Sequence, residues 1–148
     1  MNNPLTTLLG KSFTIKSKSI GNQIESILGS EINKRPEADF GFWESKSKKI
    51  DGKAQVTLGG KRTDNMNVLL ESVFSKMENV IFSEYTINED NTFTVNKITI
   101  LFSMDKSAFF NSIGNGCNLE EHNNALNIRA RKNNFFKLYG KNIIEYTA

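Results

Sequence analysis

Apolar residues recur along this chain with two different periods, and neither period persists for long. Around 20–28 they fall at helical spacing, whereas over 93–102 they alternate with polar residues as in a strand. No apolar stretch approaches the roughly 18–20 residues that span a bilayer. Strand-like segments outnumber helical ones and their order is mixed. The sequence therefore predicts an α/β fold with a mixed central sheet flanked by helices.

Individual elements follow from the same patterns. Helical spacing predicts a helix over 20–28, which Gly29 would end, and further helices over 67–74 and 106–113. Asp51-Gly52 predicts a hairpin turn that pairs 42–50 with 54–59 as neighbouring antiparallel strands, and Gly59-Gly60 then breaks the chain. The remaining strands are expected at 80–82, 93–102, 125–130 and 135–146, with a loop at 114–116.

The composition is typical of one folded domain. A length of 148 residues suits a single domain, and 38% hydrophobic with 24% charged residues excludes the disordered and fibrous classes. Cys117 is the only cysteine in the sequence, which excludes an intramolecular disulfide and a cysteine-rich zinc site. The start Met1-Asn2-Asn3-Pro4 lacks a basic segment followed by an apolar one. We therefore expect no secretory signal and no membrane partner, and a cytoplasmic location.

The distribution of charge is more informative than its sum. The net charge of +3, from 19 basic and 16 acidic residues, is too small to indicate a polyanionic partner by itself. Basic residues gather at 46–49, 61–62 and 129–132, and acidic residues gather at 84–90 and 120–121. These clusters indicate either a surface for a polyanion or a solvated surface with random clustering. The lone His122, beside Glu120-Glu121, is more typical of a surface residue than of a ligand or base.

One group of charged residues has the composition of a phosphodiester-cleaving site. Glu44 and Lys46 are two residues apart in an expected strand, so both project from one face, and Asp39 on the entering turn can fold back toward it. Converging carboxylates repel each other unless a cation joins them, and Mg²⁺ suits such a pair because it retains water and phosphate oxygens as further ligands. A neighbouring lysine can orient water or stabilise charge on the phosphate. The alternative is three solvent-exposed charges on an edge strand.

Around this group the sequence resembles the PD-(D/E)xK nucleases, and more narrowly the MutH mismatch-repair endonuclease and the MvaI/BcnI-type restriction endonucleases. Residues 21–29 resemble that family's helix, which carries a site glutamate, here Glu25, before a Leu-Gly ending. Pro36-Glu37-Ala38-Asp39-Phe40 resembles the entry to the catalytic strand, and Glu44-Ser45-Lys46 resembles its Glu-x-Lys. Residues 74–82 resemble the segment with an additional active-site lysine, here Lys76. The resemblance covers about residues 8–82.

The resemblance implies a restriction-endonuclease-like core in one domain over 1–148. Residues 1–82 would form its catalytic half and 83–148 a DNA-contacting half that is shorter than in typical members. The catalytic residues it implies are Glu25, Asp39, Glu44, Lys46 and Lys76, with Asp39 and Glu44 as ligands of Mg²⁺, for which Mn²⁺ would substitute. The DNA-contacting residues expected from the basic clusters and the resemblance are Lys48, Lys61, Arg62, Arg129, Arg131 and Lys132.

Residues 126–132 resemble a late strand of the family that carries base-contacting basic residues. Arg129 and Arg131 alternate on this candidate strand and would share a face, so bidentate contacts with guanine are chemically plausible. Contacts with phosphates alone are the alternative, as is no DNA contact at all. Phe135 and Phe136 are more typical of core residues than of base-stacking ones.

The expected function is a Mg²⁺-dependent, sequence-specific endonuclease of double-stranded DNA, of the type II restriction kind, that leaves 5′-phosphate ends. Two alternatives stay open: a MutH-like nicking enzyme of mismatch repair, and an inactive, truncated remnant that only binds DNA. Double-stranded DNA is the expected partner, and a cognate DNA methyltransferase of the same system would be a second one. The sequence leaves the oligomeric state open.

Overall fold

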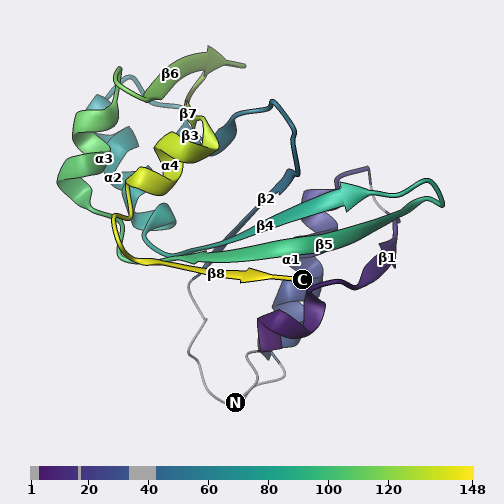
Figure 1. The fold of residues 1–148 in the computed structure, drawn as a ribbon. Helices are drawn as coiled ribbons and strands as arrows, with labels where there is room; N and C mark the ends of the chain where they lie inside the picture. The colour runs from purple at the N-terminus through teal and green to yellow at the C-terminus, as the bar shows by residue number, and fades with distance from the viewer. Residues whose placement is uncertain (1–3, 17, 34–42) are drawn as a thin grey trace. The chain divides into compact units, whose positions relative to one another are not determined.

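Two compact units make up the chain. The structure, a computed structural model, describes residues 4–16, 18–33 and 43–148 (Figure 1). The first unit comprises residues 1–52, 80–100 and 144–148, and the second comprises residues 53–79 and 101–143. The chain therefore leaves the first unit after residue 52, returns at residue 80 and leaves again after residue 100. Each unit draws on both sides of the division at residue 82 that we expected from the sequence.

The first unit contains a mixed sheet with helices. Its elements are the 3₁₀ helix η1 (Pro4–Leu8), β1 (Ser12–Thr14), α1 (Ile20–Asn33), β2 (Glu44–Lys49), β4 (Val80–Ile87), and most of β5 (Thr92–Leu101) and β8 (Ile143–Thr147). Among the described residues the strand order is β1-β5-β4-β2, and β8 also pairs with β5. β2 runs parallel to β4, whereas β1 runs antiparallel to β5. The predicted α/β class with a mixed sheet is therefore confirmed.

β4 is an interior strand of this sheet, because it lies between β2 and β5 in the strand order (Figure 1). Five consecutive residues of β4, Val80 to Glu84, are buried, so both of its faces are covered. A strand covered on both faces has a continuous apolar run rather than an alternating one. The run Val80-Ile81-Phe82 predicted such a strand, and the structure confirms it.

Helix α1 extends five residues beyond residue 28, where the sequence predicts its end. Ile24 and Leu28 lie one helical turn apart and are buried, as their spacing predicts. Gly29 was expected to end the helix, and this expectation is wrong, because α1 continues to Asn33. Gly29 does not have the positive φ of a glycine that ends a helix. A glycine inside a helix costs only about 1 kcal/mol relative to alanine, which buried apolar contacts outweigh.

The second unit contains an antiparallel sheet and three helices. Its elements are β3 (Val56–Lys61), α2 (Met66–Met77), α3 (Lys106–Ser112), β6 (Cys117–His122), β7 (Ala125–Ala130) and α4 (Lys132–Lys137). The strand order is β3-β7-β6. Gly59-Gly60 was expected to break the chain, but both glycines lie inside β3, beside a bulge. A Cβ at Gly59 would lie 3.3 Å from Val73 Cγ2, so a small residue lets α2 pack closely on this strand.

The hairpin expected at Asp51-Gly52 is absent, and that prediction is wrong. β2 pairs with β4 and β3 pairs with β7, so the two segments belong to different sheets. A two-residue type I′ hairpin needs positive φ at both central residues. Asp51 has φ of 62°, but Gly52 does not have positive φ, although its amide donates to the carbonyl of Lys49 at 3.0 Å. The chain turns here and moves on to the second unit.

The strand expected over 135–146 is also wrong in its first part. Residues 132–137 form α4, and strand β8 begins only at Ile143. Phe135, Leu138 and Tyr139 are buried, and their spacing of three and four residues is helical rather than alternating. The buried hydroxyl of Tyr139 donates to the carbonyl of Met77 at the end of α2, at 2.6 Å. Strand β6 was not predicted at all.

Helices α2 and α3 lie where the sequence predicts them. Asn65 and Asp105 are their N-caps, and each side chain accepts a hydrogen bond from a backbone amide three residues later, at 3.2 and 2.9 Å. Both helices direct buried residues to the core of the second unit, with Phe109 stacked on Phe74. Among the described residues no helix is both long and apolar enough to cross a membrane.

The Tyr139–Met77 hydrogen bond predicts a pH-dependent stability. Burial raises the pKa of Tyr139 well above its usual range near 10, because the ionised form cannot be solvated. The folded state therefore favours the neutral phenol, and its contribution is complete below about pH 10 and falls as the unfolded chain ionises above that pH. We expect the free energy of unfolding to decrease by up to about 1.4 kcal/mol per pH unit per such group.

Tyr139→Phe tests this expectation in urea unfolding from pH 7 to 11. At pH 7 it should lower the free energy of unfolding by about 1–3 kcal/mol, because the carbonyl of Met77 loses its partner. It should also flatten the alkaline decrease. Some slope should remain, since burial also raises the pKa of Tyr85 and Cys117. An unchanged alkaline slope in the variant would contradict the assignment to Tyr139.

Alanine substitutions at two glycines of α1 should change the free energy of unfolding differently. A Cβ at Gly29 meets nothing within 4 Å, so Gly29→Ala should raise the free energy of unfolding by about 0.5–1 kcal/mol. A Cβ at Gly21 would lie 2.8 Å from Ser47 Oγ, so Gly21→Ala should gain less or destabilise. Ser47→Ala should restore the gain in the double variant. Additive effects of Gly21→Ala and Ser47→Ala would contradict this packing of α1 on β2.

Candidate functional site

The candidate catalytic pair lies on β2. Glu44 and Lys46 are the first and third residues of the strand, so their side chains project from the same face, as predicted. Both are half-buried. In the parallel pairing Glu44 lies opposite Val80 and Lys46 lies opposite Phe82, which is fully buried. A carboxylate and an ammonium group therefore share one face of a strand that adjoins the buried centre of the sheet.

Lys48 continues the same face of β2. It lies opposite Glu84, which is only 6% exposed. This register gives Lys48 a structural neighbour of opposite charge, in addition to the DNA contact that we predicted for it.

Glu25 lies on the other side of β2. Its side chain is exposed on α1, and α1 packs on the face of β2 that carries Ser47, as the close approach of Gly21 shows. Ser47 alternates with Glu44 and Lys46 and so belongs to the opposite face of the strand. The structure therefore does not bring Glu25 onto the face that carries the candidate pair Glu44 and Lys46.

The predicted metal site is described only in part. Asp39 lies outside the described residues, so its position relative to Glu44 is not assigned. Within 4–16, 18–33 and 43–148, no group of three or more His, Cys, Asp or Glu side chains has a metal-binding arrangement. Glu44 supplies one hard oxygen ligand of the kind that Mg²⁺ prefers, and Mg²⁺ needs only one or two carboxylates because water and phosphate complete its shell. The carboxylate of Glu44 is therefore a ligand of the type that fits Mg²⁺.

The other predicted residues belong to the second unit. Lys76 is exposed in the last turn of α2, where a positive charge also complements the helix dipole. Lys61 and Arg62 are exposed at the end of β3. Lys132 begins α4, and its ammonium group lies 5.6 Å from the centre of the Phe136 ring. These residues supply positive charge to the surface of the second unit.

Arg129 has protein partners on both neighbouring strands. Its Nε donates to the hydroxyl of Thr57 on β3 at 3.2 Å, and its Nη1 lies 3.3 Å from a carboxylate oxygen of Glu120 on β6. Arg129 and Glu120 line a pocket of about 350 Å³, and Glu121 and His122 belong to the lining of that pocket as well. His122 is exposed, as expected from the sequence. Carboxylates beside Arg129 oppose the approach of a phosphate. The basic cluster at 129–132 gave no indication of these carboxylates.

Arg131 does not share a strand with Arg129. β7 ends at Ala130, and Arg131 is the N-cap of α4, with an extended backbone and an exposed side chain. The strand ends here because α4 begins at Lys132 and buries Phe135, whereas Phe136 is half-buried. Phe135 is fully buried, which confirms its predicted place in the core.

Sequence reasoning missed a polar network on the face of the sheet that carries Lys46 and Lys48. Thr86 belongs to this face by alternation along β4, and its hydroxyl donates to Asn96 at 3.1 Å. Thr94 bonds Ser12 at 2.7 Å, and Asn88 donates to both Thr92 and Thr94. Only the alternation of polar residues at 92, 94 and 96 gave a signal for this network.

Comparison with known proteins adds no relative. No family model, no curated protein and no solved structure matches the chain.

The two arginines predict different DNA-binding behaviour. Because Arg129 is paired with Glu120, Arg129→Ala should change affinity for duplex DNA little, whereas Arg131→Ala should weaken binding and reduce the salt dependence by about one charge. Fluorescence anisotropy at several salt concentrations, on several duplex sequences, measures both. Relaxed selectivity at particular bases in either variant would instead indicate base readout, worth roughly 1–3 kcal/mol per bidentate contact.

Proposed function

We propose that this chain is a Mg²⁺-dependent endonuclease of double-stranded DNA, of the PD-(D/E)xK type that its sequence resembles. The observation that supports the proposal most is the half-buried pair Glu44 and Lys46 on one face of β2, opposite the buried residues of β4. This arrangement follows the Glu-x-Lys of the resemblance.

The proposed roles follow from the chemistry of each group. Glu44, together with Asp39, would hold Mg²⁺, which supplies a Lewis acid for the scissile phosphate and lowers the pKa of bound water. Lys46 would donate hydrogen bonds that orient the attacking water and stabilise charge on the phosphate. Attack of the water oxygen on phosphorus would break the bond to the 3′ oxygen, which leaves as a 3′-hydroxyl, so the other end keeps a 5′-phosphate.

Glu25 and Lys76 stay in the proposal with separate tests. Glu25 belongs to α1, which packs on the face of β2 opposite to Glu44 and Lys46. Its role would therefore be structural, on that opposite face. Glu25→Gln should therefore slow cleavage less than Lys46→Ala does. Lys76 would neutralise a phosphate, and Lys76→Ala should weaken DNA binding together with cleavage.

The main test is cleavage of plasmid DNA by Lys46→Ala. The substitution should lower the cleavage rate by about a hundredfold or more in Mg²⁺, because the lysine acts in the transition state. Binding measured in Ca²⁺ should stay within about twofold of the parent. Lys49→Ala is the matched control, since Lys49 is exposed on the opposite face of the same strand and should retain the parental rate.

Three outcomes would contradict the proposal in different ways. Cleavage in excess EDTA would exclude the metal-dependent mechanism. Parental cleavage by Lys46→Ala would exclude the assignment of β2 as the catalytic strand. A gel shift of DNA without cleavage in Mg²⁺ or Mn²⁺ would favour the inactive remnant, and nicked circles without linear product would favour the MutH-like nicking enzyme. Sequencing of the product ends identifies the recognised site.

A further inference from the structure

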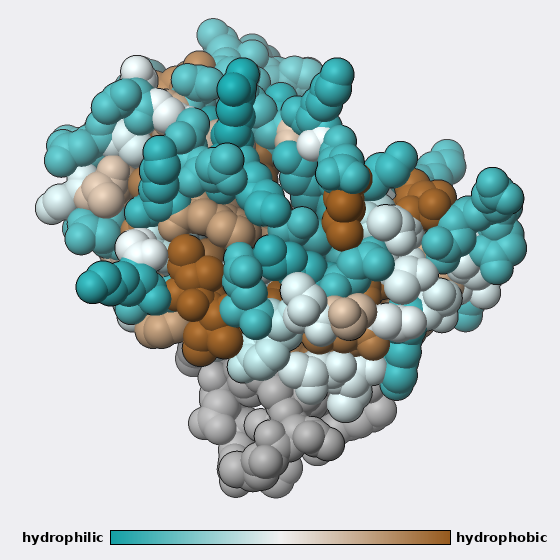
Figure 2. All heavy atoms as spheres, viewed as in Figure 1, coloured by the Kyte–Doolittle hydropathy of each residue, from teal (hydrophilic) through white to brown (hydrophobic). Residues whose placement is uncertain are grey.

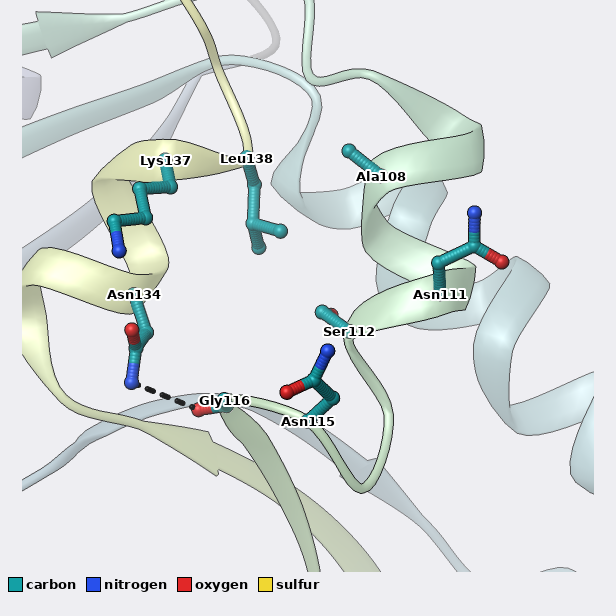
Figure 3. Close-up of a pocket in the computed structure, with 8 residues that line it drawn as sticks. All are labelled: Ala108, Asn111, Ser112, Asn115, Gly116, Asn134, Lys137 and Leu138. Atoms are coloured by element: carbon teal, nitrogen blue, oxygen red, sulfur yellow. Dashed lines mark hydrogen bonds between the residues drawn. The ribbon is translucent and has the colours of Figure 1, made fainter.

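A pocket in the second unit has no role in the proposed nuclease. It lies between α3, the loop after α3, and α4, and its volume is about 530 Å³ (Figure 3). Small-molecule sites in proteins typically occupy about 300–1,000 Å³. The residues of its lining that decide its chemistry are Ala108, Ser112, Asn115, Asn134, Lys137 and Leu138. All belong to one compact unit, so the pocket is set within that unit.

The formal charge of the pocket is positive. Lys137 is the charged residue of the lining, and no carboxylate is present there. The side chain of Lys137 is exposed, and the salt bridges between described residues do not include it. The face of the molecule in Figure 2 is mostly hydrophilic, with hydrophobic residues in separate groups. An anionic group is therefore the charged ligand that complements this pocket.

Amide groups supply both donors and acceptors beside that charge. Asn134 donates through Nδ2 to the carbonyl of Gly116 at 3.4 Å, which orients its amide (Figure 3). Asn115 and Ser112 lie across the pocket from Lys137, and the hydroxyl of Ser112 donates to the carbonyl of Phe109 at 2.6 Å. A carboxamide presents a donor and an acceptor side by side, which matches the edge of a nucleobase.

Two apolar side chains complete the lining. Leu138, which directly follows α4, and Ala108 on α3 both line the pocket (Figure 3). Leu138 is buried, with 3% of its surface exposed, so its position is fixed by the core of the unit. A flat ring can pack against such side chains while its edge reaches the amides.

We propose that this pocket binds a free nucleotide. The base would pack on Ala108, over the floor that the buried Leu138 forms, with its edge toward Asn115 and Asn134, and the phosphate would lie at Lys137. The proposal does not depend on nuclease activity, because no residue of this pocket belongs to the candidate catalytic set.

The test is a titration of the ¹⁵N-labelled full chain with AMP, GMP, CMP and UMP, followed by NMR. At least one nucleotide should give saturable shifts of the side-chain amide signals of Asn115 and Asn134. The matching nucleoside and inorganic phosphate should each bind at least about tenfold more weakly, because each lacks one part of the ligand. Equal affinity for inorganic phosphate, or no saturable shift with any of the four nucleotides, would overturn the proposal.

Variants separate the two parts of the ligand. Lys137→Ala should lower nucleotide affinity about tenfold and leave nucleoside affinity unchanged. Asn115→Asp should also weaken nucleotide binding, because it places a carboxylate in the pocket at nearly constant volume. Lys141→Ala is the matched control, an exposed lysine of the same unit that does not line the pocket. Unchanged affinity in Lys137→Ala would overturn the assignment of the phosphate.

Discussion

The parallel pairing of β2 with β4 is the constraint on which the first unit and the candidate site depend. β4 is buried on both faces over Val80 to Glu84. The register between β2 and β4 therefore determines which buried residue of β4 adjoins each residue of β2. Parallel strands cannot be joined by a hairpin, because the chain must cross back to the same end of the sheet. The connection between them is the segment from Ile50 to Asn79, which contains β3 and α2. The second unit therefore begins as the crossover of the first.

This constraint explains which parts of the fold could be predicted from the sequence. The strand at 80–82 is a continuous apolar run, and the helices at 67–74 and 106–113 have apolar residues at helical spacing, so the local sequence is enough to place them. The hairpin at Asp51-Gly52 failed because a local turn signal says nothing about the partner of each strand. The strand expected at 135–146 is wrong in its first part because the buried residues Phe135, Leu138 and Tyr139 follow helical spacing rather than alternation.

The candidate site also has parts that the sequence could predict and parts that it could not. That Glu44 and Lys46 share a face follows from alternation, which is a property of any strand. The partners of Arg129 depend on the pairing of β7 with both β3 and β6. β3 lies more than 50 residues before β7 in the chain. Glu120 could not be assigned to Arg129 from the sequence, since β6 itself was not predicted. The opposite faces of Glu25 and Glu44 likewise follow from the packing of Gly21 on Ser47.

The three lysines of β2 are distinguished by register rather than by sequence. Lys49 is exposed and alternates onto the face of Ser47, whereas Lys46 and Lys48 share the face of Glu44. Lys48 lies opposite the buried Glu84, so its charge has a protein carboxylate close by. Lys46 lies opposite Phe82, which is apolar and fully buried. An ammonium group beside apolar surface interacts more strongly with a phosphate than one in water, because the local dielectric is lower. Lys46, which shares its face with Glu44 and adjoins the buried Phe82, therefore differs in its surroundings from the exposed Lys49.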